Sequence, residues 1–268
     1  MHTIMNYPFD IEEIKAAAAS ATGRSHRRHG TLCEDAYAIE TLKNWKGKVF
    51  LGAVAVCDGA GSCRFGSLGA KIASRVAARW LLENYHRIQY PGVSLEEIAK
   101  RLISVIQRRI RKFAGLKSSP QNLKPFSCTL VAAVIHLDGS WLAVHIGDGG
   151  IVGLGENGPF IVSCPAKGDY ANVTFFVTDK DAAQNTEIIR NTCSVRSFAL
   201  FTDGLENSLI QASELRTAPA VAQILTWLDD SASNEVSDAL QTALEEVFLQ
   251  KTMDDCTLAL LSGVCIKS

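Results

Sequence analysis

Three short apolar runs in this chain each end abruptly in an Asp-Gly pair. The runs span residues 51–57, 141–146 and 198–202, and the aspartates that follow them are Asp58, Asp148 and Asp203. An inverted copy puts Asp254 and Asp255 directly before the apolar run 256–261. Runs of this length and composition predict buried β-strands, and Asp-Gly marks their ends. The chain is therefore expected to fold into sheets with carboxylates at several strand ends.

Carboxylates at strand ends are held on a rigid frame and still face solvent. Glu34 and Asp35, directly before the strand-like run 36–41, add another acidic pair of this kind. If these groups converge, they form a hard, oxygen-rich site suited to Mg²⁺ or Mn²⁺. Each Asp-Gly taken alone is a common turn, so an alternative is that they are separate turn residues. Together they favour a metal site, although their spacing in the sequence alone does not show that they converge.

The order of expected elements indicates an α+β fold. Strand-like segments lie at 36–41, 48–57, 127–136, 140–146, 150–155, 173–178, 197–202 and 256–262. Helical periodicity or capping signals mark 66–86, 95–113, 219–229 and 234–250. Asp138-Gly139 joins two strands as a hairpin turn, so Asp138 is left out of the acidic set. Strands and helix pairs in this order predict mostly antiparallel sheets flanked by segregated helices.

Composition excludes several classes of protein. The 268 residues carry a formal net charge of −1, which gives no global basic field for nucleic acid or acidic membranes. The longest apolar stretches are far too short to span a bilayer. Asp10 and Glu12 interrupt any signal-peptide pattern, and none of the eight cysteines forms a Cys-x-x-Cys pair. We therefore expect a cytoplasmic protein with reduced thiols, including Cys63 in a glycine-rich loop.

Four cations crowd the end of the helix at 95–113. They are Arg108, Arg109, Arg111 and Lys112. A phosphorylated partner is one interpretation of this cluster. A solvated helix end is the favoured one, because cations near a helix C-terminus complement its dipole.

Taken in order, the motifs resemble those of a known enzyme family. They are Glu34-Asp35-Ala36, Asp58-Gly59-Ala60-Gly61, Ser127-Cys128-Thr129, Ile146-Gly147-Asp148, Thr202-Asp203-Gly204 and Asp254-Asp255-Cys256-Thr257. This set resembles the metal-dependent protein phosphatase family (type 2C) from about Gly23 to Leu261. Residues 23–26 and 170–174 look most similar to a bacterial branch of that family.

The resemblance implies one catalytic domain over residues 1–268, built as a four-layer α/β/β/α sandwich. It implies two Mn²⁺ or Mg²⁺ ions, with Asp58 bridging them, the Gly59 carbonyl on one, and Asp203 and Asp254 completing the other. Glu34 and Asp35 would act largely through bound waters. Asp254 is preferred to Asp255 because it stands three residues before Thr257, as in the family's Asp-Asn-x-Thr motif.

The implied activity is hydrolysis of phosphoserine and phosphothreonine in phosphorylated protein substrates. A water shared by two ions about 3.5–4 Å apart is activated and aimed in line at phosphorus. The ions also neutralise charge on the phosphoryl oxygens. Neither a cysteine nor a serine nucleophile is needed, and we expect a monomer.

Some positions depart from the family pattern. Gly30 stands where many members have a phosphate-binding arginine. Arg24, Arg27 and Arg28 are near and each could take that role, and Arg28 is the candidate chosen. Ala60 stands where eukaryotic members have a histidine proposed as general acid, so His26 or His29 is a candidate proton donor, with a metal-bound water as the alternative. Asp148 is the candidate ligand of a third metal, a site left doubtful by Asn207 at the position of its usual acidic partner.

Two alternatives to an active phosphoprotein phosphatase remain. One is a catalytically weak or inactive phosphatase-like binding protein, against which the retained Asp58, Asp203 and Asp254 argue. The other is a metal phosphoesterase acting on a small phosphate ester, which would share the same site chemistry. Whether residues 155–195 form a flap over the site is also left open.

Overall fold

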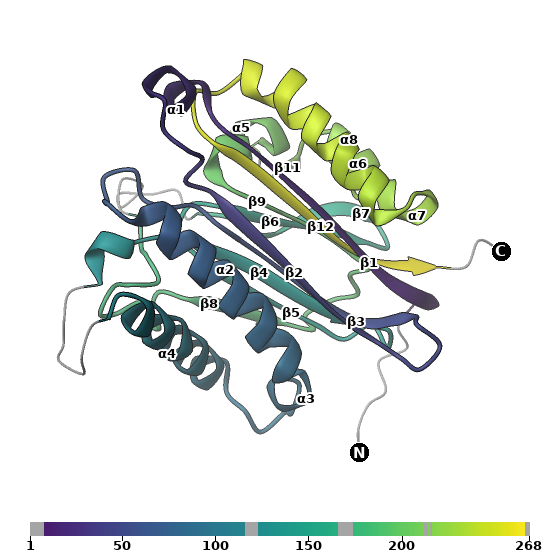
Figure 1. Cartoon of the computed structure of the whole chain (residues 1–268). Coiled ribbons are helices and arrows are strands. Elements are labelled where there is room, and N and C mark those ends of the chain that lie inside the picture. Colours follow the sequence, from purple (N-terminus) through teal and green to yellow (C-terminus); the bar gives the residue numbers. More distant parts are fainter. Residues whose placement is uncertain (1–7, 116–122, 166–173, 212–213, 215, 266–268) are drawn as a thin grey trace.

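Two five-stranded sheets face each other, with helices on both outer faces (Figure 1). The structure is a computed structural model that describes residues 8–115, 123–165, 174–211, 214 and 216–265. The four layers confirm the predicted α/β/β/α sandwich. Within these residues, no helix has the length and apolar character needed to cross a membrane.

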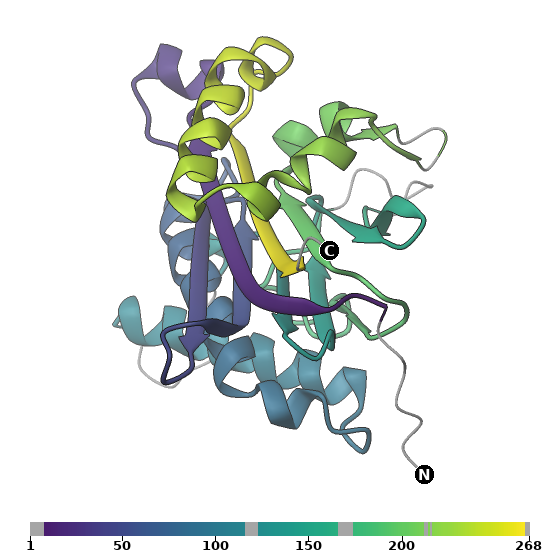
Figure 2. The ribbon, with the colours of Figure 1, turned by 90° about the vertical axis from the view of Figure 1, so that its right-hand side faces the viewer.

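The first sheet has the strand order β1-β12-β9-β6-β7, with every pairing antiparallel. Its strands are β1 (Ile11–Ala21), β12 (Cys256–Cys265), β9 (Ser197–Phe201), β6 (Gly150–Gly155) and β7 (Gly158–Ser163). Helices α6 (Ala220–Ile224), α7 (Trp227–Asp230) and α8 (Ser233–Glu246) cover its outer face (Figure 2). A small separate ribbon pairs β10 (Ile210–Gln211) with β11 (Arg216–Thr217).

The second sheet has the order β2-β3-β4-β5-β8 and is also antiparallel. Its strands are β2 (Ala36–Lys43), β3 (Val49–Cys57), β4 (Leu130–His136), β5 (Trp141–Ile146) and β8 (Glu187–Arg190). Helices α2 (Gly66–Glu83), α3 (Tyr85–Ile88) and α4 (Leu95–Phe113) cover its outer face (Figure 1). Among the described residues, the remaining elements are the short helices α1 (Arg24–His29) and α5 (Glu206–Leu209) and three 3₁₀ turns (Lys124–Phe126, Asp203–Leu205, Phe248–Gln250).

Local signals in the sequence explain several of these boundaries. Ser94 caps α4 and accepts a hydrogen bond from the Glu97 N–H at 3.1 Å, as its position predicts. Asp138-Gly139 turns the β4–β5 hairpin, with Gly139 in the left-handed region at φ 81°. The predicted separation of Asp138 from the other acids is therefore confirmed.

Strand β1 is an element that the sequence analysis did not assign. Its alanines alternate between two cores: Ala17 and Ala19 pack in the core under the helices of the first sheet, and Ala16 and Ala18 pack in the core between the sheets. Alanine has the highest helix propensity, so a run of alanines gives no local signal for a strand. Here burial on both faces overrides that propensity.

Two predicted elements need correction. The strand expected at 173–178 is wrong for its described residues 174–178, which form no strand. The Val177 N–H donates to the Cys128 carbonyl and the Val177 carbonyl accepts from the Gln107 side chain, both at 2.9 Å, so loop contacts satisfy this backbone. The helix expected at 219–229 is two short helices, α6 and α7.

The strand register brings the acidic segments to one end of the molecule. Ala36 at the start of β2 pairs with Cys57 at the end of β3, and Leu258 near the start of β12 pairs with Phe201 at the end of β9. Antiparallel strands place the start of one beside the end of the next. The residues just outside these strands therefore meet at the same edge of the sandwich.

Candidate metal centre

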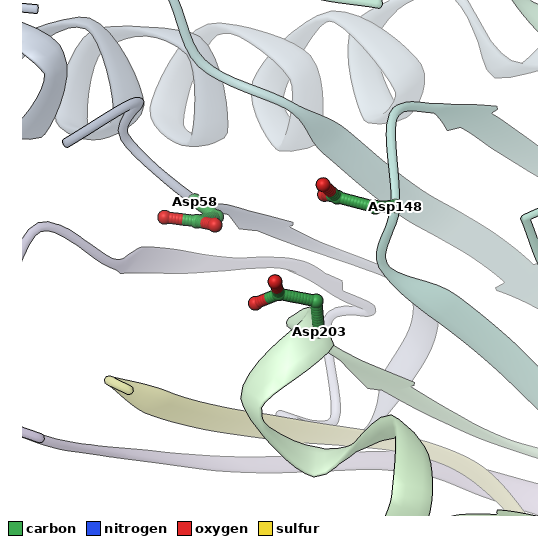
Figure 3. A group of neighbouring side chains, drawn as sticks. All are labelled: Asp58, Asp148 and Asp203. Carbon is green, nitrogen blue, oxygen red and sulfur yellow. The ribbon is translucent and has the colours of Figure 1, made fainter. Parts of the chain in front are cut away.

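Asp58, Asp148 and Asp203 lie together at this edge and point toward a common space (Figure 3). They follow β3, β5 and β9, so both sheets contribute to the group. One carboxylate oxygen from each lies within 4.8 Å of the others. The structure thus brings together the three aspartates that end the apolar runs of the sequence.

The carboxylates of this group are only partly satisfied by protein atoms. Thr174 Oγ1 donates to Asp148 Oδ2 at 2.8 Å. Asp148 Oδ1 is buried and has no hydrogen-bond partner among the described residues. A buried oxygen without a donor is costly unless a cation or other ligand meets it.

Charge repulsion within the group is also strong. Burial raises the pKa of Asp58 to about 11, and the nearby charges of Asp35, Asp203 and Asp148 add to this effect. Burial raises the pKa of Asp203 to about 7, with Asp148 and Asp254 adding to it. Carboxylates held this close favour either protonation or a bound cation.

Asp35 and Glu34 occupy different depths beside the group. Asp35 is 5% exposed and accepts a hydrogen bond from Thr202 Oγ1 at 2.8 Å. Burial raises the pKa of Asp35 to about 7 and also raises the pKa of the more exposed Glu34. Asp35 is thus an internal carboxylate held by a hydroxyl, and Glu34 lies nearer the solvent.

Asp254 and Asp255 are neighbours in sequence with opposite surroundings. Asp255 is 2% exposed and accepts the N–H groups of Gly23 and Glu34, both at 2.6 Å. Asp254 is exposed, and its charge helps to raise the pKa of Asp58 and of Asp203. The carboxylate of Asp255 is therefore occupied by two backbone amides from distant loops, whereas Asp254 Oδ1 accepts the N–H of Asp255 at 2.9 Å and its charge acts on the group.

Gly59 directs the loop that carries Asp58. A Cβ at Gly59 would lie 2.4 Å from the carbonyl carbon of Gly66, at the start of α2. The Gly59 N–H donates to the Glu34 carbonyl at 3.2 Å. The absence of a side chain lets this backbone pass between α2 and the loop that precedes β2.

His26 and Arg28 lie on α1, beside these loops. His26 Nδ1 is 3.0 Å from Asp255 Oδ1, and His26 Nε2 is 3.8 Å from Glu34 Oε2. Interaction with the Asp255 carboxylate raises the pKa of His26. Arg28 is exposed and forms no ion pair with a described residue, whereas Arg24 donates to the Thr252 carbonyl.

A polar chain that the sequence did not predict runs from buried His145 and Ser163 to exposed Glu187. His145 Nδ1 lies 2.5 Å from Ser163 Oγ, which in turn donates to Glu187 Oε2 at 2.5 Å. His145 Nε2 lies 3.1 Å from the Gly147 carbonyl, one residue before Asp148, and burial lowers the pKa of His145. In the sequence, a histidine inside the apolar run 141–146 was the one available signal.

Known proteins are similar to this chain in sequence and in fold. A family model described as protein phosphatase 2C matches residues 22–245. Serine/threonine-protein phosphatase 3 of Escherichia coli (strain K12) is 30% identical over 251 residues, which cover 90% of this chain and 95% of that protein.

Solved structures agree in fold at lower identity. Serine/threonine phosphatase Stp1 from Staphylococcus aureus gives a TM-score of 0.58 at 16% identity, covering 96% of each chain. The catalytic domain of the serine/threonine protein phosphatase PstP, solved with two manganese ions, also gives 0.58 at 16% identity. That match covers 94% of this chain and 98% of the PstP chain.

Proposed function

We propose a role for each site residue. The premise is that this chain belongs to the protein phosphatase 2C family and is a serine/threonine protein phosphatase. Asp58, Asp203 and Asp254 hold two divalent cations, and Asp148 holds a third. The observation that carries the metal centre is the convergence of Asp58, Asp148 and Asp203 within 4.8 Å. Asp254 is added because its charge helps to raise the pKa of both Asp58 and Asp203.

The residues present fit a divalent cation. The free Oδ1 of Asp148 is a ligand atom without a protein donor. The raised pKa values of Asp58 and Asp203 reflect negative charge that a cation would compensate. An all-oxygen donor set suits Mg²⁺ or Mn²⁺. Relatives of the same fold are described with magnesium, for RsbX, and with two manganese ions, for PstP.

The remaining ligand roles follow the surroundings of each group. The Gly59 carbonyl contributes to the same ions as Asp58. Glu34 and Asp35 act through intervening water, since Asp35 is already held by Thr202 and Glu34 lies toward solvent. Asp254 is the ligand in place of Asp255, whose two oxygens are occupied by backbone N–H groups.

Cations bound here would supply an activated water nucleophile and neutralise phosphoryl charge. The chain's own residues would orient the substrate around that centre. The exposed guanidinium of Arg28 would bind the substrate phosphate through two parallel hydrogen bonds. His26, whose pKa is raised, would deliver a proton to the serine or threonine oxygen as its bond to phosphorus breaks.

The substrate's leaving group separates these roles experimentally. p-Nitrophenyl phosphate needs no proton at its leaving oxygen, whereas a phosphothreonine peptide does. His26→Gln is expected to lower kcat on the peptide by about 10²-fold or more, with a much smaller effect on p-nitrophenyl phosphate. Equal losses on both substrates would instead give His26 a structural role through Asp255.

The central test is metal-dependent activity of the whole chain on the same two substrates. Activity is expected with Mn²⁺, loss with a chelator, and recovery when Mn²⁺ is restored. Asp58→Asn should be inactive under all three conditions. Cys63→Ser is the matched control and should retain full activity. Metal-loaded protein that hydrolyses neither substrate, or an inactive Cys63→Ser protein with its metals bound, would overturn the proposal.

The domain organisation, oligomeric state and cellular location are part of the same proposal. Residues 1–268 act as one catalytic domain, working as a monomer on phosphorylated proteins. All eight cysteines are free thiols, which suits a reducing compartment, and we assign the protein to the cytoplasm on that basis.

A further inference from the structure

A groove of about 1010 Å³ is lined by β2 at the outer edge of the second sheet, by α2, and by the end of α4. Four consecutive β2 residues, 37–40, border it. Side chains of successive strand residues point to opposite faces, so a groove bordered by all four follows the strand's edge. β2 is the outermost strand of its sheet, and no described strand pairs with that edge.

The floor of this β2–α2 groove is apolar. Leu68, Ile72 and Val76 recur every four residues along one face of α2 and are half-buried. Two aromatic side chains also line the groove: Tyr37 is 40% exposed and Phe113 is 58% exposed. A segment lying here would bury apolar surface as well as pair with the strand edge.

The rim of the groove is positively charged. Lys71, Arg75 and Arg109 are exposed, and none forms an ion pair or hydrogen bond with a described residue. Arg79 also lines the groove but is paired with Glu83 at 2.7 Å, and Glu40 is the acidic member of the lining. In a chain of net charge −1, these three unpaired cations make a local basic surface.

The groove starts beside the candidate metal centre. β2 begins at Ala36, directly after Asp35, and α2 begins at Gly66, whose backbone packs against Gly59. At about 3.3 Å per residue, the distance along β2 from Asp35 to Glu40 is roughly 17 Å. A segment extending from the centre would reach the basic rim within about four to six residues.

We propose that the β2–α2 groove binds an acidic, extended segment of the phosphoprotein substrate, which adds a strand to the edge of β2. Its carboxylates pair with Lys71, Arg75 and Arg109, and its apolar side chains cover the α2 floor. Charge disfavours a second copy of this chain as the occupant, because a two-fold pairing through β2 would bring the same cations face to face. The inference rests on the proposed phosphatase function, since the metal centre supplies the other anchor of the substrate.

The test compares three kinds of substrate of the whole, metal-loaded protein. Two kinds are phosphothreonine peptides with a tail six residues from the phosphothreonine, and the tail is acidic in one kind and neutral in the other. Each kind is made in two forms, with the tail on the N-terminal or on the C-terminal side of the phosphothreonine. The third is p-nitrophenyl phosphate. The variant Arg75→Glu/Arg109→Glu reverses two rim charges. Arg108→Glu is the matched control, since Arg108 is exposed on α4 but lines a different groove.

The acidic tail is expected to lower KM, and the double variant to raise KM for that peptide by about tenfold with kcat unchanged. The neutral-tail peptide and p-nitrophenyl phosphate should not respond, and Arg108→Glu should behave as wild type. Methylating alternate backbone nitrogens of the acidic tail should weaken binding in one register only, as strand pairing requires. An equal effect on all three substrates, or none on the acidic-tail peptide, would overturn the proposal.

Binding of the unphosphorylated acidic peptide separates this inference from the phosphatase proposal. Its affinity, measured by fluorescence anisotropy, requires no catalysis and should fall about tenfold in the double variant. Failure of the phosphatase proposal removes turnover of p-nitrophenyl phosphate but leaves this binding. Failure of the docking inference removes the binding and leaves turnover. Self-association through β2, seen as a dimer that Arg75→Glu/Arg109→Glu alters, would also contradict it.

Discussion

Two kinds of aspartate lie at the same end of this molecule. Asp255 is buried, and its two oxygens accept the N–H groups of Gly23 and Glu34 at 2.6 Å, with His26 3.0 Å away. Asp58, Asp148 and Asp203 crowd together, and one buried oxygen of Asp148 has no described hydrogen-bond partner. One environment satisfies a carboxylate and the other leaves carboxylates in need of a ligand.

Under the proposed function, the difference distinguishes a residue that supports the fold from residues held for binding a cation. Hydrogen bonds to a charged group typically contribute about 1.5–3 kcal/mol, so Asp255 stabilises the junction of three loops. The raised pKa values of Asp58 and Asp203 mean that their ionised forms are disfavoured in the metal-free fold. Removing a charge should therefore have opposite effects on stability in the two environments.

The largest expected effect comes from Asp58→Asn. Activity on a phosphothreonine peptide should fall by about 10²–10³-fold or more, the cost of losing a group that organises transition-state charge. The metal-free variant should nevertheless unfold at a higher temperature than metal-free wild type, because the substitution removes a carboxyl group whose ionised form this site disfavours. Steady-state kinetics and thermal unfolding in chelator measure the two effects. A variant that loses both activity and metal-free stability would show that Asp58 is a structural carboxylate like Asp255.

Asp255→Asn should act in the opposite sense on stability. An amide presents one oxygen where the carboxylate presents two, so a backbone N–H loses its acceptor and His26 loses its charged partner. We expect a loss of about 2–4 kcal/mol in the free energy of unfolding, with or without metal. Urea unfolding at fixed pH measures it. Unchanged stability would mean that the loops at Gly23 and Glu34 are held by other contacts.

Part of the fold was predictable because local sequence patterns determine it. The apolar runs that end in Asp-Gly coincide with β3, β5 and β9, since buried strands need continuous apolar residues and exposed ends need turns. β1 was missed because its alanines carry no strand signal of their own. The strand predicted at 173–178 was wrong because an apolar run alone does not reveal which backbone partners it will meet.

The candidate site was also predictable from the sequence only in part. The sequence order of Asp58, Asp148 and Asp203 indicated a shared site, and the register of the strands brings them together. The two carboxylate oxygens of Asp255 accept hydrogen bonds from backbone N–H groups more than 200 residues away in the sequence, at Gly23 and Glu34. The hydrogen bond from Thr174 to Asp148 arises from tertiary packing, which no spacing rule encodes.

The pH dependence of stability gives a third, intermediate effect. The pKa values of Asp35 and Asp203 are raised from 3.8 to about 7, so the metal-free native state binds more protons than the unfolded state between these values. Their contribution to stability is fully present below about pH 3.8 and is lost as the pH rises through about 7. His26, with its raised pKa, contributes in the same direction. Metal-free protein should therefore be more stable at about pH 6.5 than at about pH 8.

The range from about pH 6.5 to about pH 8 lies above the range in which His145 has the opposite effect on stability. Burial lowers the pKa of His145, so that residue destabilises the native state only at pH values below about 6.5, where the unfolded chain binds its proton. Saturating Mn²⁺ should remove or reverse the trend, because binding requires the carboxylates without protons. Asp203→Asn should weaken the trend in metal-free protein. A metal-free protein that becomes more stable as the pH rises across this window would contradict the assignment.

The smallest effect is expected from Thr174→Val, which removes the hydrogen bond at 2.8 Å that orients Asp148. The concentration of Mn²⁺ needed for half-maximal activity should rise about two- to tenfold, which corresponds to the roughly 0.5–1.5 kcal/mol typical of one hydrogen bond. Thr178→Val is the matched control, because Thr178 contacts Ser127 Oγ at 2.8 Å and touches no carboxylate of the group. An equal shift in both variants would mean that the loop, and not the orientation of Asp148, sets the response to metal. A shift confined to Thr174→Val would place Asp148 among the groups held for binding, in contrast to Asp255.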